Sequence, residues 1–482
     1  MVEHRKGWPF PDYSPGRVIS SLILLAAAAG CSDATGPEPW ERGDLLDRLN
    51  AIPGVQAVEI QPYYGYPRAF QLDITQPVDH RDSSGPSFTQ RAYLSHVSDS
   101  LPMVFAPSGY GTSPQSGQEL AGILQTNCLS VTHRFFPDAR PSTLEWEYLD
   151  IWQSAEDHHR VVTLLKKIYR GQWVSSGASK GGETVLFHRR FHPEDVDATV
   201  AYVAPLLFSA QDPRFMPYLR TRGTPSARAA ILDFQRRILA RKAEVLDDFE
   251  GWFVRNGLSF SLPPAAAFES AVISYPWSFW QRNLFDPSEI PGPQATGQEM
   301  IDHLAVVTRL HFDSDEYRDY FRAYIYQALT EIGMPGIEFQ EIQDLITEEE
   351  TDVREAYGFP PDLIFEYRPE SIPDVLAWLQ QHGHRIIYIY GELDPWTAGA
   401  VALTGQADAL RVIQSGADHG VRIAELDQRE EVLARLSAWL ERSISLALEA
   451  RAGADPIRVP PEAARFGTPE ALSLRPRAGF SR

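Results

Sequence analysis

Six short apolar runs, separated by stretches with helical patterning, constrain the fold of this chain more than any other feature. Apolar residues dominate each run, and residues that favour turns bound it. Alternation of this kind is typical of a mostly parallel β-sheet with helices on both faces. The runs occupy residues 103–106, 128–131, 173–175, 199–203, 385–390 and 410–413.

The segment before these runs has another pattern. Three β-like runs, 56–60, 70–74 and 91–97, are separated by clusters of Pro, Gly, Asp and Ser, which predicts an antiparallel start to the sheet. Residues 154–169 then repeat apolar side chains with helical spacing, which predicts a helix that covers the sheet.

Between residues 207 and 374 the strand pattern gives way to helical, aromatic-rich sequence, as in 227–249 and 314–329. Because the strand pattern resumes at 385, we interpret this region as a helical insertion in one α/β unit; the alternative is an independent helical domain. The predicted organisation is a signal peptide at 1–30, a tether at 31–45, an α/β core at 46–206, a helical insertion at 207–374, the rest of the core at 375–452 and a loosely ordered tail at 453–482.

Charge and composition exclude several classes of protein. The 482 residues carry 44 Lys and Arg against 64 Asp and Glu, a net charge of −20, which repels a phosphate backbone and argues against nucleic-acid binding. The hydrophobic content of 43% excludes a disordered chain. Because no apolar run reaches the roughly 20 residues that a spanning helix needs, we expect no transmembrane helix.

The N-terminus predicts export. An apolar run at 18–29 follows Arg5, Lys6 and Arg17, the layout of a signal peptide. Cys31 comes directly after Ala28-Ala29-Gly30, which resembles the lipobox of bacterial lipoproteins and implies lipid attachment at Cys31. The alternative is an ordinary secretory signal with Cys31 incidental. We expect a protein of the cell envelope or the exterior, held to a membrane only by this lipid.

Ser179 is the candidate nucleophile. It lies in Gly177-Ala178-Ser179-Lys180-Gly181-Gly182, directly after a strand-like run and before a helix-compatible one. In a nucleophile elbow the serine occupies a strained turn from strand to helix, and glycines let the backbone close. A structural glycine turn is the alternative interpretation.

A serine nucleophile needs a base and an acid that orients the base. In α/β-hydrolases the order along the chain is Ser, acid, His. Asp394 follows the run at 385–390 and is the predicted acid, with Glu392 as the alternative. His419 is the predicted base, because no other histidine follows Asp394.

The oxyanion of acyl transfer needs two preorganised donors. The predicted donors are the backbone N–H of Lys180, next to the nucleophile, and the backbone N–H of Tyr110, in the glycine-rich loop 107–112. A plain glycine turn is the alternative for this loop. We expect no cofactor and no metal, since the adjacent His158 and His159 would face different directions on a helix.

Motifs around these residues carry a resemblance to a known peptidase family. They are Ser108-Gly109-Tyr110, Thr132-His133-Arg134-Phe135-Phe136, Trp146-Glu147-Tyr148-Leu149, Ala155-Glu156-Asp157-His158-His159, residues 177–182 and 197–205, Asp394-Pro395-Trp396 and His419-Gly420. The chain is similar to the PS-10 family of secreted Streptomyces tripeptidyl and prolyl tri/tetrapeptidyl aminopeptidases. The resemblance implies an α/β-hydrolase with a helical cap that cleaves short peptides from free N-termini, often after proline.

The resemblance implies short peptides or unfolded polypeptide N-termini as substrates, and an acidic group that holds the free amine. Glu348, Glu349 and Glu350 are candidates for that group, and the residues do not decide among them. His133 and Arg134 follow the run at 128–131, where either substrate contact or support of the elbow is expected. The alternative functions are an esterase or lipase on the same fold and a non-catalytic envelope lipoprotein.

Overall fold

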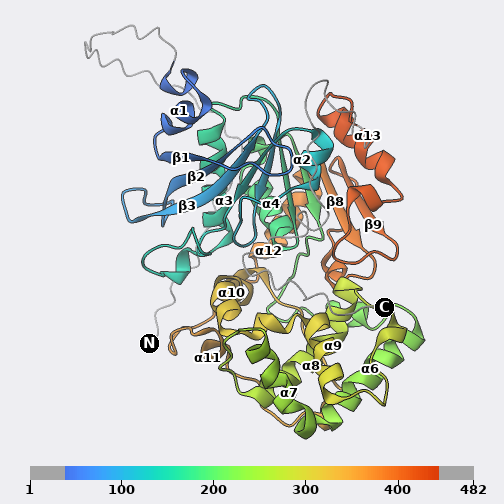
Figure 1. The fold of residues 1–482 in the computed structure, drawn as a ribbon. Coiled ribbons are helices and arrows are strands. Elements are labelled where there is room, and N and C mark those ends of the chain that lie inside the picture. Colours follow the sequence, from blue (N-terminus) through green and yellow to red (C-terminus); the bar gives the residue numbers. More distant parts are fainter. Residues whose placement is uncertain (1–37, 445–482) are drawn as a thin grey trace, which may run out of the picture. The chain divides into compact units, whose positions relative to one another are not determined.

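A mixed sheet of nine strands forms the centre of the structure, a computed structural model that describes residues 38–444 (Figure 1). The strand order is β1-β2-β3-β5-β4-β6-β7-β8-β9. Strands β1, β2, β3 and β5 pair antiparallel in that order, and β5 through β9 pair parallel. The predicted antiparallel start and parallel continuation are therefore confirmed. The strands are β1 (Val55–Ile60), β2 (Arg68–Pro77), β3 (Ser87–His96), β4 (Met103–Pro107), β5 (Asn127–Val131), β6 (Trp173–Ala178), β7 (Ala198–Tyr202), β8 (Ile386–Gly391) and β9 (Ala409–Gln414).

Helices cover both faces of the parallel strands, which makes this an α/β-hydrolase fold, as predicted. Successive strand residues point to opposite faces. Val104 and Ile387 pack with helices α2 and α13, whereas Phe105 packs with α3, and Tyr388 with α4 and α12. The α-helices are α1 (Leu45–Asn50), α2 (Glu119–Leu124), α3 (Ile151–Leu165), α4 (Lys180–Phe191), α5 (Phe215–Leu219), α6 (Pro225–Ala240), α7 (Lys242–Arg255), α8 (Pro264–Arg282), α9 (Gly297–Thr308), α10 (Asp315–Gln327), α11 (Val353–Tyr357), α12 (Ser371–His382) and α13 (Arg429–Trp439).

The connections of the sheet reverse direction between β4 and β6. The chain leaves β4 for β5 on one side, returns to β6 on the other side of β4, and continues to β7. Ligands of open parallel sheets bind at such a point, beyond the carboxyl ends of the strands. The fold therefore places the loop after β4 and the turn after β6 where a site is expected.

Helices α5 to α11 lie between β7 and β8 in the sequence and contain most of a hydrophobic core of their own (Figure 1). Phe234, Phe249 and Phe268 are fully buried in it. The region 227–249, where the sequence predicts helix, is divided at Arg241, which ends α6 and precedes α7. Both helices bury side chains in the same core, and the Arg241 guanidinium donates to the carbonyl oxygen of Ala295 at 2.7 Å, which supports the break.

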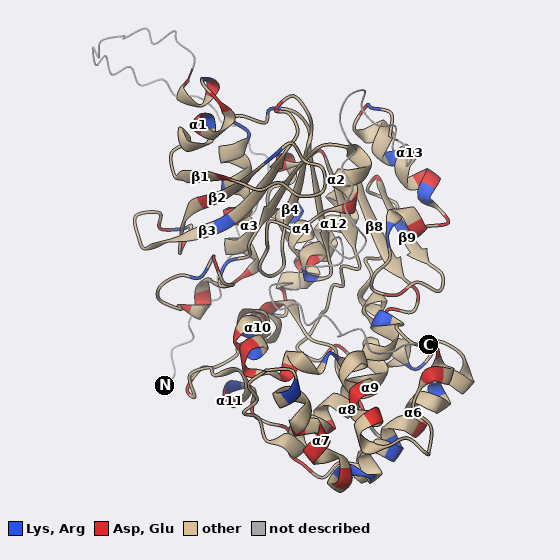
Figure 2. Cartoon of the chain, in the orientation of Figure 1, with Lys and Arg blue, Asp and Glu red and all other residues tan. Residues whose placement is uncertain are grey.

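Acidic and basic side chains are interspersed over helices α6 to α9 (Figure 2). In the part of the chain that the structure describes, no helix has the length and apolar character needed to cross a bilayer. The predicted signal peptide, Cys31 and the tail at 453–482 lie outside the described residues. The end of the predicted tether is among the described residues. There the Lys167 ammonium lies over the Trp40 ring, 3.9 Å from the ring centroid.

Candidate active site

Ser179 occupies the sharp turn between β6 and α4. Its φ of 55° and ψ of −130° are strained for a residue with a side chain. Gly177 permits the turn, because a Cβ there would lie 2.2 Å from the carbonyl oxygen of Gly181. Ser179 itself is half-buried. These are the features of a nucleophile elbow, at the position where the sequence predicts one.

Asp394 and His419 are brought together from the ends of two neighbouring strands. Asp394 follows β8 and His419 follows β9; both are buried. His419 Nδ1 and Asp394 Oδ2 lie 2.6 Å apart, so the ring N–H donates to the carboxylate and Nε2 is left as the acceptor. The Glu392 carboxylate instead accepts from Ser415 Oγ at 2.7 Å and from the Gly416 N–H at 3.0 Å.

The loop after β4 approaches the elbow very closely. A Cβ on Gly109 would lie 2.6 Å from the backbone nitrogen of Gly181, so only glycine fits there. Lys180 is the first residue of α4, so its backbone N–H points out of the N-terminus of this helix. The backbone N–H of Tyr110 donates to Ser108 Oγ at 3.0 Å. This N–H would have to leave Ser108 in order to donate to an oxyanion. The assignment of Lys180 and Tyr110 as oxyanion donors remains a prediction.

Sequence reasoning missed a buried pair of ionisable side chains beside the elbow, Lys180 and Glu183. Each is 4% exposed, and among the described residues neither head group makes a hydrogen bond or an ion pair. Burial lowers the pKa of Lys180 to about 7 and raises the pKa of Glu183 to about 8. The only signal in the sequence was two ionisable residues in a helix that must pack against the sheet.

Aromatic side chains enclose this pair and join the loop after β4 to helix α10. The Lys180 ammonium lies 5.8 Å from the ring centroid of Tyr110 and 5.9 Å from that of Phe136. The Tyr110 ring makes edge contact with Tyr324, and the Gly111 N–H donates to the hydroxyl of Tyr320 at 2.9 Å. One side of the candidate site is therefore aromatic and includes residues of the helical segment.

Arg134 does not face the candidate site. Its guanidinium is buried and donates to both oxygens of Asp157, at 2.7 and 2.9 Å. This ion pair holds the loop after β5 against α3, which favours the supporting role over substrate contact. His133 is also buried, and burial holds its pKa well below the usual value, so the ring is neutral.

His159, His192 and Asp195 form a group whose spacing could suit a metal ion. The two imidazole rings are stacked, with centroids 4.0 Å apart and 9° between their planes. A metal lies in the plane of each imidazole that binds it, so one ion cannot serve both rings as they stand. His159 bonds to Asp195, and His192 bonds to Glu156, which makes a hydrogen-bond network the better description.

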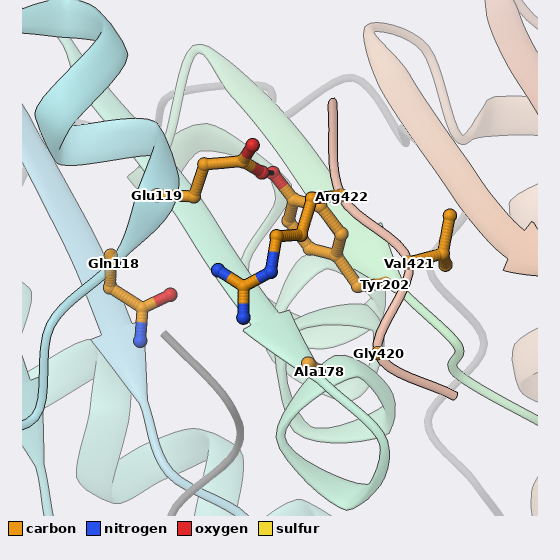
Figure 3. Close-up of a pocket in the computed structure, with 7 residues that line it drawn as sticks. All are labelled: Gln118, Glu119, Ala178, Tyr202, Gly420, Val421 and Arg422. Atoms are coloured by element: carbon orange, nitrogen blue, oxygen red, sulfur yellow. Dashed lines mark hydrogen bonds between the residues drawn. The ribbon is translucent and has the colours of Figure 1, made fainter. Parts of the chain in front are cut away.

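A small pocket lies at the carboxyl ends of β6 and β7 (Figure 3). Ala178, which precedes the serine, and Gly420, which follows the histidine, both line it. The remaining lining residues come from the start of α2 and the residue before it, from the end of β7, and from the loop that contains His419. They are Gln118, Glu119, Tyr202, Val421 and Arg422.

Comparison with known proteins places the chain in a family. Residues 38–463 match the PS-10 peptidase S37 family. The chain belongs to this family. A prolyl tri/tetrapeptidyl aminopeptidase of Streptomyces mobaraensis is 33% identical over 435 residues, which cover 87% of this chain and 90% of the relative.

Membership in the PS-10 family confirms the resemblance drawn from the sequence motifs and makes the chain a serine peptidase. Solved structures similar to this PS-10 peptidase include two enzymes of low sequence identity. Proline iminopeptidase of Mycobacterium smegmatis is 13% identical, covering 77% of this chain and 97% of its own, with a TM-score of 0.34. The 2-hydroxy-6-oxo-6-phenylhexa-2,4-dienoate hydrolase of Rhodococcus sp. strain RHA1 is 12% identical, covering 80% and 99%, with a TM-score of 0.36.

Proposed function

We propose that this PS-10 peptidase releases tripeptides, and tetrapeptides as the longer product, from the free N-termini of peptides, often after proline. The hydrogen bond between His419 and Asp394, beside the elbow that holds Ser179, is the observation that carries the proposal. The name of the Streptomyces mobaraensis relative supplies the length of the product and the prolyl preference.

In the proposed mechanism Ser179 Oγ attacks the scissile carbonyl carbon while His419 Nε2 takes its proton. The N–H groups of Lys180 and Tyr110 stabilise the tetrahedral oxyanion. His419 then returns the proton to the leaving amine, and an acyl-enzyme remains on Ser179. Water, deprotonated by His419, attacks the ester and releases the short peptide. Asp394 keeps the imidazole in the tautomer that both steps need.

The helical segment at 207–374 acts as a cap in this proposal. Its helix α10 contacts the loop after β4 through the bond between Tyr320 and Gly111. A cap that close to the nucleophile would exclude folded proteins and admit chain ends, which suits an exopeptidase.

Hydrolysis of an Ala-Ala-Pro anilide, compared with that of nitrophenyl acyl esters, tests the proposal. We expect turnover of the anilide that is abolished in Ser179→Ala, and labelling of Ser179 by a fluorophosphonate probe. Turnover of esters alone would instead indicate an esterase or lipase. Failure of the probe to label folded protein, with a control hydrolase labelled in parallel, would indicate a non-catalytic binding protein.

We also propose that the enzyme is exported and anchored by lipid on Cys31, and its thiols test this. Cys128 is buried in β5, and burial raises its pKa to about 12. Ellman's reagent should therefore not react with the folded mature protein. After unfolding, a lipidated chain should show one thiol, from Cys128. Two thiols per chain would contradict lipid attachment.

A further inference from the structure

Helix α10 of the helical segment lies against the core, beside the loop after β4 (Figure 1). Ala323 of this helix packs in one buried cluster with Phe136 of the loop after β5. The turn that follows α10 is bonded to the core as well. In that turn the Glu331 carboxylate accepts from the N–H of Ile151 at 2.8 Å and from the hydroxyl of Ser371 at 3.0 Å. Because Ile151 begins α3 and Ser371 begins α12, these bonds hold the end of α10 at a fixed place on the core.

The peptide unit between Tyr110 and Gly111 is held at both of its polar atoms. The carbonyl oxygen of Tyr110 accepts from the N–H of His133, in the loop after β5, at 2.8 Å. The Gly111 N–H belongs to the same planar unit and donates to the hydroxyl of Tyr320, on α10, at 2.9 Å. A Cβ on Gly111 would lie 2.9 Å from that hydroxyl oxygen, so the close approach requires glycine. The core therefore fixes one side of this unit and α10 fixes the other.

The preceding peptide unit, between Gly109 and Tyr110, carries the proposed oxyanion donor and is held only from within the loop. Its N–H donates to Ser108 Oγ at 3.0 Å, and the Ser108 hydroxyl donates to the carbonyl oxygen of Gly111 at 2.9 Å. Glycine permits backbone torsions that other residues resist, so Gly109 lets this unit rotate while the next one stays in place.

The ring of Tyr110 is also held. It makes edge contacts with Phe136 of the core, with centroids 5.6 Å apart, and with Phe321 and Tyr324 of α10, at 5.4 and 5.8 Å. Helix α10 thus contacts Tyr110 on its side chain and fixes the peptide unit that follows it. The N–H of Tyr110 is the part of this residue that is left to turn.

We propose that Tyr320 is a positioning residue of the peptidase. Its hydroxyl holds the unit between Tyr110 and Gly111 still, so that the Tyr110 N–H alone turns from Ser108 to the oxyanion of the transition state. The inference rests on the proposed peptidase function. It gives the helical segment a part in the chemical step, in addition to control of access. Loss of a group that acts where the oxyanion forms should slow turnover and leave substrate binding nearly unchanged.

Tyr320→Phe removes only the hydroxyl and tests this. We expect kcat for an Ala-Ala-Pro anilide to fall about tenfold to a hundredfold, less than for loss of a direct oxyanion donor, with KM changed by no more than about twofold. Tyr317→Phe is the matched control. Tyr317 lies one turn earlier on the same helix, and its ring packs against Phe312 and Phe321. This variant should keep the wild-type kcat.

A pair of inhibitors separates positioning of the oxyanion donor from support of the fold. Ser179 Oγ adds to the aldehyde carbon of Ala-Ala-prolinal and leaves an oxyanion on the aldehyde oxygen, whereas the alcohol Ala-Ala-prolinol forms no such bond. Tyr320→Phe should weaken inhibition by the aldehyde by about the same factor as it lowers kcat, and should leave inhibition by the alcohol unchanged. Equal losses for the two inhibitors would overturn the inference.

Gly111→Ala breaks the same bond from its other side, because the added Cβ displaces the Tyr320 hydroxyl. It should lower kcat as Tyr320→Phe does, and the double variant should lose no more than the larger single loss. It also supplies the test if Tyr320→Phe does not fold, which circular dichroism and thermal unfolding establish. Fully additive losses, or an equal loss in Tyr317→Phe, would overturn the inference.

The wild-type enzyme separates failure of this inference from failure of the proposed function. Turnover of the anilide by the wild type, with an unchanged kcat in Tyr320→Phe, rejects the role of Tyr320 alone. Absence of anilide turnover by the wild type rejects the peptidase.

Discussion

Replacing Asp394 with asparagine should lower kcat/KM for an Ala-Ala-Pro anilide by roughly 10,000-fold. The carboxylate accepts the Nδ1–H of His419 at 2.6 Å, and that bond leaves Nε2 able to take a proton from Ser179. An asparagine keeps the size of the side chain and an acceptor for the Trp396 N–H, but it allows the wrong imidazole tautomer. Steady-state kinetics at neutral pH measure the loss.

Glu392→Gln is the matched control for this prediction. Glu392 lies two residues away on the same loop, and its carboxylate bonds to Ser415 and Gly416. We expect this variant to keep nearly the wild-type kcat/KM. Full activity in Asp394→Asn, or a large loss confined to Glu392→Gln, would show that the acid of the triad is misassigned. Circular dichroism and thermal unfolding establish that both variants fold.

Replacing Arg134 with methionine should lower the free energy of unfolding by about 3–5 kcal/mol. The Arg134 and Asp157 side chains are both 0% exposed, so the change leaves a carboxylate buried without its cation. The guanidinium also donates to the carbonyl oxygen of Val78 at 3.1 Å, and this bond would be lost as well. Urea unfolding followed by tryptophan fluorescence gives the difference.

Arg190→Met is the control for the effect of burial. Arg190 donates to both carboxylate oxygens of Asp374, but the two side chains are 27% and 42% exposed. Removing it should cost at most about 1 kcal/mol. Equal losses in the two variants would contradict the role assigned to the buried pair.

The ion pair of Arg134 with Asp157 also makes the stability lost in Arg134→Met depend on pH. Burial raises the pKa of Asp157, but the charge of Arg134 and bonds from His80 and Arg134 outweigh it, and the pKa lies below its usual value. In the wild type this stabilisation is present above the unfolded pKa and is lost as the pH falls through the folded pKa. In the variant the bond from His80 remains, but the charge and bonds of Arg134 that lowered the pKa of Asp157 are gone, so this pKa is higher in the variant than in the wild type. The difference in the free energy of unfolding between the wild type and Arg134→Met should therefore narrow as the pH falls from roughly 6 to 4.

Strand positions were predictable because buried parallel strands are short apolar runs that the sequence displays directly. The run at 410–413, for example, lies within β9, and the run at 385–390 becomes β8. Strand length was less predictable at the antiparallel edge. Strand β2 extends to Pro77 and β3 begins at Ser87, because backbone pairing continues through polar residues that carry no apolar signal.

The triad candidates were predictable because each follows a strand in an order that the chemistry requires. Lys180 and Glu183 were not, since their burial depends on aromatic residues from distant segments, Tyr110 and Tyr324 among them. The pocket beside Arg422 was also missed. It forms where Gln118, directly before α2, lies near Arg422 in the loop after β9. These two segments are far apart in the sequence, so their spacing does not predict that they come together.

Mass spectrometry of the products from a small peptide library, with free and with blocked N-termini, tests the central claim most directly. We expect tripeptides, with tetrapeptides as the longer product, to be released from free N-termini, often after proline. Blocked peptides should remain intact, and Ser179→Ala should release nothing. Cleavage of blocked peptides at internal positions, or product release by Ser179→Ala, would contradict the account.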